Sequence, residues 1–507
     1  MDRMVKDGIA RHFWANSTLY TLTNLFQKGA AFLLLPLYTL YLDPHAYGVL
    51  AVVTALNGFL AVAFTLALTG AITRFYFEYR DDPALLAEFW GTIITFVTLL
   101  SLVMGGLLLV VGEWLLRPLL GEIAFWPYAA LGVLATLFQP FFLTFLAVLQ
   151  TRNQGGRYAL ISLGHFVTLT LVTIALVVGL GWGVTGALTA SLVAAATFFV
   201  LAMWALRRDF RLCLRWRHLR PALAYSYPQI PHAVAGQVTA YADRLVLNAN
   251  LGAGPTGIYA VGAMVAMVVE VAAQSVNRAY VPLGMEALKR RIPAELGQFR
   301  ALGSLIVAAF CQLGATIGAF STEIVLLLAA PAFRDAAAVV PWLAFIGVAS
   351  AIYYLLVNIL FFERDAAKFL PIGTLTAAGL SVLMAIFLVP RFGMFGAAVS
   401  ALVAQVCATL LIGAIAARFD PVSWDYRRYG AAFAIGLACS VWLGSLPEAP
   451  SLSTTLIKCA GLVALAAVLG GLFWRRPLIL YEALLRLARR RPAEAAALFG
   501  DPGPIAP

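Results

Sequence analysis

Long apolar windows recur along almost the whole chain, and they limit the folds that it can adopt. Each holds ~20 residues with few charges, the length that a helix needs to cross a hydrocarbon core of about 30 Å. The first six windows are 14–42, 46–72, 89–111, 126–149, 158–180 and 184–206. The rest are 222–251, 256–283, 299–320, 340–362, 369–389, 394–417, 429–446 and 452–474. The sequence therefore predicts an all-α, polytopic membrane protein with about 14 transmembrane helices.

One further apolar stretch, residues 322–341, is interpreted differently. Its core, "STEIVLLLAAPAF", is too short to cross and is expected to form an apolar lip. The composition supports a membrane protein, since 62% of the 507 residues are hydrophobic and only 12% are charged. So few charges could not cover the surface of a soluble protein of this size.

Basic residues are distributed unevenly between the two sides of the predicted bundle. With the N-terminus in the cytoplasm, the outer loops hold only Arg117, Arg334 and Arg391 of the chain's 35 Lys and Arg. This is the positive-inside pattern, and it predicts that both termini are cytoplasmic. Topology thereby accounts for the net charge of +11, so we expect no nucleic-acid partner.

Motifs for metal or nucleotide binding are missing from the sequence. The five cysteines have no CxxC spacing and no pair in an outer loop, and no GxxxxGK[ST] loop occurs. We therefore expect no metal site, no cofactor and no disulfide framework.

An internal repeat divides the chain. "GVLAV" at Gly48 is similar to "GIYAV" at Gly257, and "GVTGALTASLVAA" at Gly183 is similar to "GMFGAAVSALVAQ" at Gly393. A third pair, "QGGRY" and "DAAKF", has almost the same offset of about 210 residues. The offset spans six helices, an even number, so the copies have the same orientation in the membrane.

The repeat predicts two parallel six-helix lobes followed by two C-terminal helices. The expected parts are an N-lobe (1–206), a short cytoplasmic surface helix as linker (207–221), a C-lobe (222–418), helices 13 and 14 (419–476), and a basic amphipathic cytoplasmic tail (477–507). Transporters with such repeats commonly bind substrate where the lobes meet.

Ionisable residues inside the windows are the first candidates for a functional site, because each is costly in a bilayer and usually faces a cavity or a partner. They are Lys28, Asp243, Arg244, Glu270 and Arg278. The positions that correspond to them in the other lobe are uncharged, which favours a role in function over one in the fold. Lys458 lies near the outer end of its window, where it can reach the interface, and is excluded. His165 is expected to be a packed, hydrogen-bonded histidine.

Asp243 and Arg244 pose a problem of depth and of direction. Adjacent helical residues point about 100° apart, so the two side chains need separate partners. A straight helix starting at Arg220 would place them near the outer interface unless Pro228 and Pro231 break it. A bent helix that carries this pair is a plausible gate, and a static kink is the alternative.

Two other groups of polar residues share helix faces. Glu270, Gln274, Asn277 and Arg278 form one stripe, which we expect to line a cavity, with Glu270 as a proton or cation site. Arg74 and Glu78 lie one turn apart at the cytoplasmic end of the second window. An ion pair with an anchoring role explains them as well as contact with a substrate does.

Three segments closely resemble the polysaccharide-biosynthesis flippases of the multidrug, oligosaccharidyl-lipid and polysaccharide exporter superfamily. They are "NLFQKGAAFLLLPLYTLYLDPHAYGVLAVV" at Asn24, "GAITRFYFEY" at Gly70 and "ADRLVLNANLGAGPTGIYAVG" at Ala242. The resemblance implies a non-enzymatic transporter of the bacterial inner membrane. Its cargo would be an undecaprenyl-diphosphate-linked oligosaccharide, an O-antigen or exopolysaccharide repeat unit, moved from the inner to the outer leaflet by alternating access.

The resemblance also suggests partners and roles. Membrane lipids, a polysaccharide polymerase and glycosyltransferases are expected partners, and H+ or Na+ is a possible coupling ion. Lys28, Arg244 and Arg278 would neutralise the diphosphate, with Arg74 as an inner contact, while Asp243 and Glu270 would set register, coupling or release. A lipid II flippase and a cation-coupled multidrug exporter stay open as alternatives. A membrane glycosyltransferase or polymerase fits less well, because the outer loops are short and carry few carboxylates.

Overall fold

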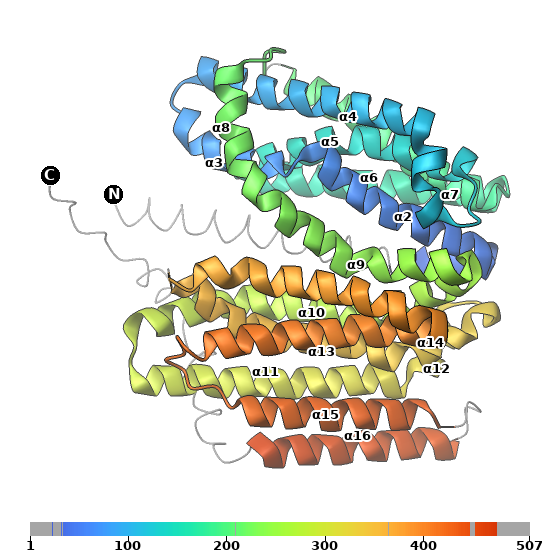
Figure 1. The fold of residues 1–507 in the computed structure, drawn as a ribbon, viewed down its shortest axis with the longest axis vertical. Helices are drawn as coiled ribbons and strands as arrows, with labels where there is room; N and C mark the ends of the chain where they lie inside the picture. Colours follow the sequence, from blue (N-terminus) through green and yellow to red (C-terminus); the bar gives the residue numbers. More distant parts are fainter. Residues whose placement is uncertain are drawn as a thin grey trace, which may run out of the picture.

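A computed structural model describes residues 34–207, 209–363, 365–446 and 452–473, together with Thr23 and Phe32, and its regular elements in these ranges are helices. Figure 1 shows two groups of helices stacked along the long axis of the molecule. The first group, the N-lobe, contains α2 (Pro44–Thr65), α3 (Leu68–Tyr79), α4 (Pro83–Leu120), η1 (Phe125–Ala129), α5 (Ala130–Thr151), α6 (Gly155–Thr173), η2 (Ile174–Gly179) and α7 (Gly183–Leu206).

A bent run of helices leads from the N-lobe into the second group, the C-lobe. The run consists of α8 (Trp216–Ser226), η3 (Tyr227–Gln229) and α9 (Ile230–Leu251). The C-lobe continues with α10 (Ala253–Arg290), α11 (Pro293–Ala319), α12 (Ser321–Leu328), η4 (Pro331–Ala338), α13 (Val340–Phe362), η5 (Ala367–Phe369) and α14 (Leu370–Ala416). The last two helices, α15 (Tyr426–Gly444) and α16 (Leu452–Phe473), pack against α11, on the side away from the N-lobe (Figure 1).

The prediction of an all-α, multi-pass membrane protein is confirmed. Ten helices in the described ranges are long and apolar enough to cross a membrane. One of them, α14, is two spans joined at Gly393, whose φ of 58° and ψ of −135° are not helical. The more polar α9 and α15 add further spans, and most of the first predicted window lies outside the described residues.

The stretch interpreted as a lip forms two short elements, α12 and η4. Each has eight residues, which is too short to cross a bilayer, and the chain returns to the bundle at α13. The prediction that this stretch does not span the membrane is therefore confirmed.

Repeat-related glycines adopt related backbone conformations. Gly183, at the start of α7, has a φ of 55°, and Gly393, between the two halves of α14, has a φ of 58°. Both values lie in the left-handed region, where glycine has no steric penalty. The repeat seen in the sequence thus corresponds to a repeated turn in the structure.

The linker is helical only from Trp216, although a surface helix was expected from residue 207. The segment before α8 lies along the start of α4, where Arg211 N donates to Ala87 O at 3.2 Å. Arg152 and Asp209 form an ion pair of 2.7 Å that joins the linker to α5. These bonds replace the helical ones, so the linker is attached to the N-lobe.

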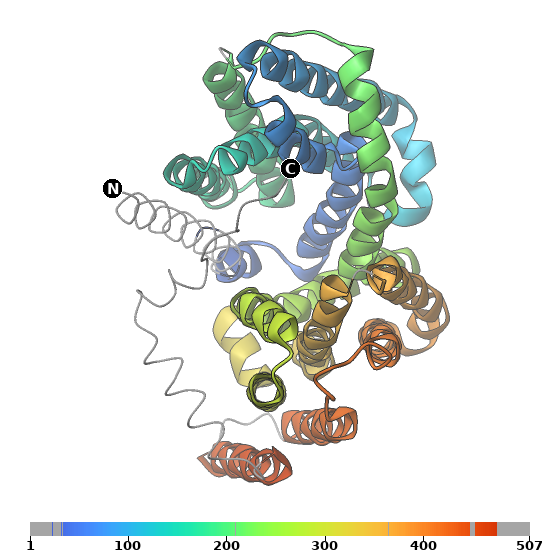
Figure 2. The same cartoon turned by 90° about the vertical axis from the view of Figure 1, so that its left-hand side faces the viewer.

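The helix bundle has two ends, the linker end and the contact end. The linker end holds Tyr79, Arg211 and Arg290, and the contact end holds Asp43, Leu120 and Gly252. Contacts between the lobes are made by α2 with α9 and α10, and by α4 with α9. Figure 2, turned by 90°, also shows α9 running between the two groups.

Candidate functional site

Asp243 and Arg244 lie in the C-terminal half of α9. The helix ends at Leu251, so Asp243 is eight residues, or about 12 Å, from the contact end. The chain before them is not one straight helix, because η3 separates α8 from α9. Pro228 lies in η3 and Pro231 in the first turn of α9, where the chain bends without losing internal helical hydrogen bonds.

Asp243 points into the C-lobe. Its side chain is buried, with 8% of the residue exposed, and its Oδ2 accepts a hydrogen bond of 2.6 Å from the hydroxyl of Tyr259 on α10. Its Oδ1 accepts from the backbone N–H of Arg244 at 2.7 Å. The carboxylate is therefore held between α9 and α10, and it does not reach toward the outer headgroups.

Arg244 points in another direction, toward the N-lobe. On the same face of α9, Gln237 and Tyr241 pack against Gly58 of α2 so closely that a Cβ there would lie 2.6 Å from Gln237 Oε1 and 3.1 Å from Tyr241 Cε2. Seven residues after Gln237 and three after Tyr241, Arg244 continues this face. The adjacent pair thus has separate surroundings, as the helical geometry predicts.

The guanidinium of Arg244 bends back along α9 toward the linker end. Its Nη1 donates to Ala240 O, one turn nearer the linker end, at 3.3 Å, and its Cζ lies 5.3 Å from the centre of the Tyr241 ring. Its Nε is buried without a hydrogen-bond partner among the described residues. No ion pair within 4.0 Å joins it to a carboxylate in the described part of the chain, so its charge is available to an anion.

Glu270 faces α13 within the C-lobe. Its Oε1 accepts from Tyr354 OH at 2.8 Å and from Gln274 Nε2 at 2.9 Å, whereas its Oε2 is buried with no hydrogen-bond partner in the described residues. Two turns along α10, Asn277 Oδ1 accepts from Asn358 Nδ2 at 2.9 Å. Glu270 and Asn277 of the polar stripe therefore face α13, whereas Arg278 at its end is exposed.

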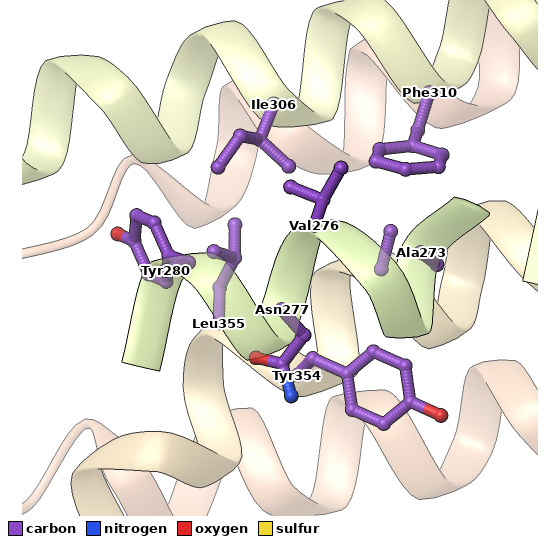
Figure 3. Close-up of a pocket in the computed structure, with 9 residues that line it drawn as sticks. Ala273, Val276, Asn277, Tyr280, Ile306, Phe310, Tyr354 and Leu355 are labelled. Carbon is purple, nitrogen blue, oxygen red and sulfur yellow. The ribbon is translucent and has the colours of Figure 1, made fainter. Parts of the chain in front are cut away.

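A small cavity lies beside this stripe, between α10, α11 and α13. Figure 3 shows Asn277 and Tyr354 at its edge and the side chains of Ile306 and Phe310 from α11 across from them. Its volume is about 10 Å³ and most of its lining is apolar. A cavity of this size has room for about one water molecule and is far too small for an oligosaccharide.

The other predicted site residues lie nearer the linker end. Arg278 is exposed on α10, 25 residues or about 38 Å from Ala253, and has no ion pair among the described residues. Arg74 and Glu78 form an i,i+4 ion pair of 2.6 Å, with side chains 51% and 42% exposed. Lys28 lies outside the described residues.

Two exclusions made from the sequence have different outcomes. The expectation that Lys458 reaches the membrane interface is wrong. Its side chain is 3% exposed, and its Nζ lies 2.6 Å from Glu323 Oε1 on α12. The lip supplies a carboxylate that hydropathy could not place beside this lysine. His165 is packed as predicted, with Phe142 stacked on it at 4.8 Å and Phe198 edge-on at 5.2 Å, but the expected hydrogen bond is not found among the described residues.

Sequence reasoning missed the tyrosines that bind the two buried carboxylates. Tyr259 belongs to the repeated motif "GIYAV", and the first copy has Leu50 at that position. A comparison of the two copies therefore contained a signal for Tyr259. Tyr354 lies in an apolar run without such a signal.

Two lobes of long apolar helices define a polytopic helical membrane protein. A profile of the family described as "Polysaccharide biosynthesis protein" matches residues 13–286, which is more than half of the chain. The chain belongs to this family. A relative in Haemophilus influenzae, "Lsg locus putative protein 1", is 27% identical over 282 residues, which cover 54% of this chain and 67% of the relative.

Solved structures show the same fold at low sequence identity. The lipid II flippase MurJ, in an inward closed conformation, matches with a TM-score of 0.68 and 14% identity, over 91% of this chain and 98% of the other. An inward-facing multidrug resistance transporter of the MATE family and MOP superfamily has a TM-score of 0.62 and 15% identity, over 80% of this chain and 95% of the other. An outward-facing MATE transporter has a TM-score of 0.52 and 16% identity, over 82% and 96%.

Proposed function

We propose that this protein flips an undecaprenyl-diphosphate-linked oligosaccharide from the inner to the outer leaflet of the bacterial inner membrane, by alternating access and without catalysis. The observation that carries the proposal is Arg244, whose charge faces the lobe boundary without a carboxylate partner in the described residues. An uncompensated cation inside a membrane span is costly and marks a substrate or ion pathway. A diphosphate is an anion that a guanidinium binds well.

Arg278 and Arg74 extend this pathway toward the linker end in the proposal. Arg278 is exposed and unpaired among the described residues, so it is suited to first contact with the diphosphate. Arg74 is already neutralised by Glu78, which makes it a weaker ligand and leaves the pair as a contact or gate at that end. Lys28 is retained as a third diphosphate ligand from the sequence.

Asp243 and Glu270 have different duties in the proposal. Asp243 fixes α9 to α10 through Tyr259 and so sets the register of Arg244. Glu270 has one buried oxygen without a partner in the described part of the chain, so that oxygen is free to bind a cation. We assign it the coupling role, with the bend at Pro228 and Pro231 as the hinge of the moving helix.

The proposed orientation places the linker end in the cytoplasm. Exposed arginines at that end, among them Arg207, Arg215 and Arg291, fit the positive-inside rule. The contact end is then the closed outer end.

Reconstitution tests the proposal. Liposomes containing the protein should move a fluorescent undecaprenyl-diphosphate oligosaccharide across the bilayer, whereas Arg244→Ala and Arg278→Ala should be inserted and inactive. Asn250→Ala is the matched control, because its side chain is exposed and bonds only within its own helix, to Val246 O. Wild-type flipping by both arginine variants would reject the site.

One alternative is favoured by a specific observation. The match to the lipid II flippase MurJ covers 98% of that chain with the highest of the three TM-scores given above. Lipid II and a lipid-linked polysaccharide unit share the diphosphate and the polyprenyl tail and differ in the sugar. Competition between the two lipids in the liposome assay, with a cationic dye as a third substrate, separates this alternative and that of a multidrug exporter from the proposal.

A further inference from the structure

At the contact end, one buried amide ties the C-lobe to the N-lobe. Asn248, near the end of α9, is 1% exposed, and its Nδ2 donates to Leu119 O and Leu120 O of α4, both at 2.9 Å. The last carbonyls of a helix have no partner within it. Asn248 therefore satisfies two groups of the N-lobe that would otherwise need water.

A carboxylate makes the complementary bond in the other direction. Glu122, two residues after α4, accepts from the backbone N–H of Ala253 at 3.0 Å, which is the first residue of α10. An anion at a helix N-terminus is stabilised by the free N–H groups and the helix dipole. His45, at the start of α2, lies 3.5 Å from the same Glu122 oxygen.

Backbones meet directly beside these bonds. A Cβ on Gly48 of α2 would lie 1.8 Å from Ala253 O, and one on Gly257 of α10 would lie 2.0 Å from Pro44 O. These two glycines are the first residues of the repeated motifs, so the two copies of the repeat touch each other here. At the same end, Tyr47 of α2 packs against Phe333 of the lip, with the two rings edge-on and their centres 5.7 Å apart.

We propose that Glu122 and Asn248 form a latch that holds the lobes together at the contact end, and that its release is required for this end to open. The inference rests on the proposed alternating access and adds positioning residues that lie outside the cargo site. The latch bonds involve backbone groups at helix ends, and water can form hydrogen bonds with these groups once the lobes separate. The latch is therefore reversible, and its strength sets the ratio of closed to open lobes.

Distance measurements by pulsed electron spin resonance test the latch without any substrate. Spin labels would be placed on the exposed positions Ala124 and Ala249, in a background in which the five native cysteines are replaced. In lipid nanodiscs, the protein without latch mutations should show one short distance. Asn248→Leu and Glu122→Ala should each add a longer distance, with about a tenfold rise in the ratio of open to closed lobes.

Two further variants keep the test decisive. Glu122→Gln preserves the size of the side chain and removes its charge, so it should raise the ratio of open to closed lobes less than Glu122→Ala does. It also tests the latch if Asn248→Leu does not fold. Asn250→Leu is the control, on the same helix end but bonded within α9. Distances unchanged in every latch variant would overturn the inference. Widened distances in a protein that flips no lipid-linked sugar would reject the proposed function and leave the latch standing.

Discussion

In the C-lobe, Asp243 and Tyr259 form a buried hydrogen bond of 2.6 Å, whereas the corresponding positions of the N-lobe, 209 residues earlier, are Leu34 and Leu50. Leu35 likewise stands where the C-lobe has Arg244, and Ala61 where it has Glu270. The two lobes thus use similar helices with different side chains. A fold that tolerates leucines in one copy does not need charges in the other, so the polar pairs of the C-lobe are best explained by function.

The largest effect is expected from making the C-lobe resemble the N-lobe. Asp243→Leu with Tyr259→Phe should abolish flipping and leave the melting temperature close to that of the wild type, because both polar partners of the buried bond are removed together while the buried ring is kept. Tyr259→Phe alone should lower stability by about 1–3 kcal/mol, since it leaves Asp243 buried without its side-chain donor. Liposome flipping and thermal unfolding in detergent measure the two effects. Full flipping by the double variant would contradict the claim that the polar residues found only in the C-lobe serve transport.

The buried ion pair between Lys458 and Glu323 should behave in the opposite way. It joins α16, which lies beyond the repeat, to the lip, and we expect a structural role. Lys458→Met should cost about 1–3 kcal/mol, because it leaves Glu323 without its cation in a partly buried place where water offsets part of the loss. Lys458→Met combined with Glu323→Leu should recover most of the melting temperature and retain flipping. Loss of flipping in a stable double variant would show that the pair belongs to the transport mechanism.

Gly48 and Gly257 occupy equivalent positions in the two copies of the repeat, and substitutions there test whether their contact is symmetric. Gly48→Ala and Gly257→Ala should each destabilise the protein by about 1–3 kcal/mol, because a Cβ at either position meets a backbone carbonyl. The matched control is Gly254→Ala, whose added Cβ would meet nothing within 4 Å. Melting temperatures of the three variants measure this. A loss at one of the two glycines but not the other would show that the contact is less symmetric than the repeat suggests.

The smallest effect is expected at the exposed pair in the N-lobe. Removing Arg74 and Glu78 together, as Arg74→Gln with Glu78→Gln, should change stability by less than about 0.5 kcal/mol, because both side chains are half exposed. Flipping should fall by a few-fold if the pair contacts cargo and should not change if the pair only anchors α3. The initial rate of flipping at limiting substrate distinguishes these outcomes.

The sequence predicted the spans, the lip and the repeat because hydrophobic length and internal similarity are local properties. It also predicted that Asp243 and Arg244 need separate partners, since the angle between adjacent helical residues is fixed. It could not provide Tyr354 for Glu270 or Glu323 for Lys458. Those contacts join helices distant in sequence, so they depend on packing that hydropathy does not encode.

The depth of Asp243 depended on a different local detail. Counting from the basic linker assumed one straight helix, whereas the linker is partly extended and η3 separates α8 from α9. The start of the seventh helix is set by bonds such as Arg211 N to Ala87 O. A sequence window cannot reveal these bonds, because Ala87 belongs to another part of the chain.

Lipid binding by Arg244 tests the central claim most directly, because it needs neither transport nor coupling. We predict that Arg244→Gln weakens binding of undecaprenyl diphosphate in nanodiscs at least about tenfold, as expected for loss of a hydrogen bond to a charged group. Binding of undecaprenol, which has no phosphate, should not change. Equal affinity of the variant and the wild type for undecaprenyl diphosphate would contradict the account.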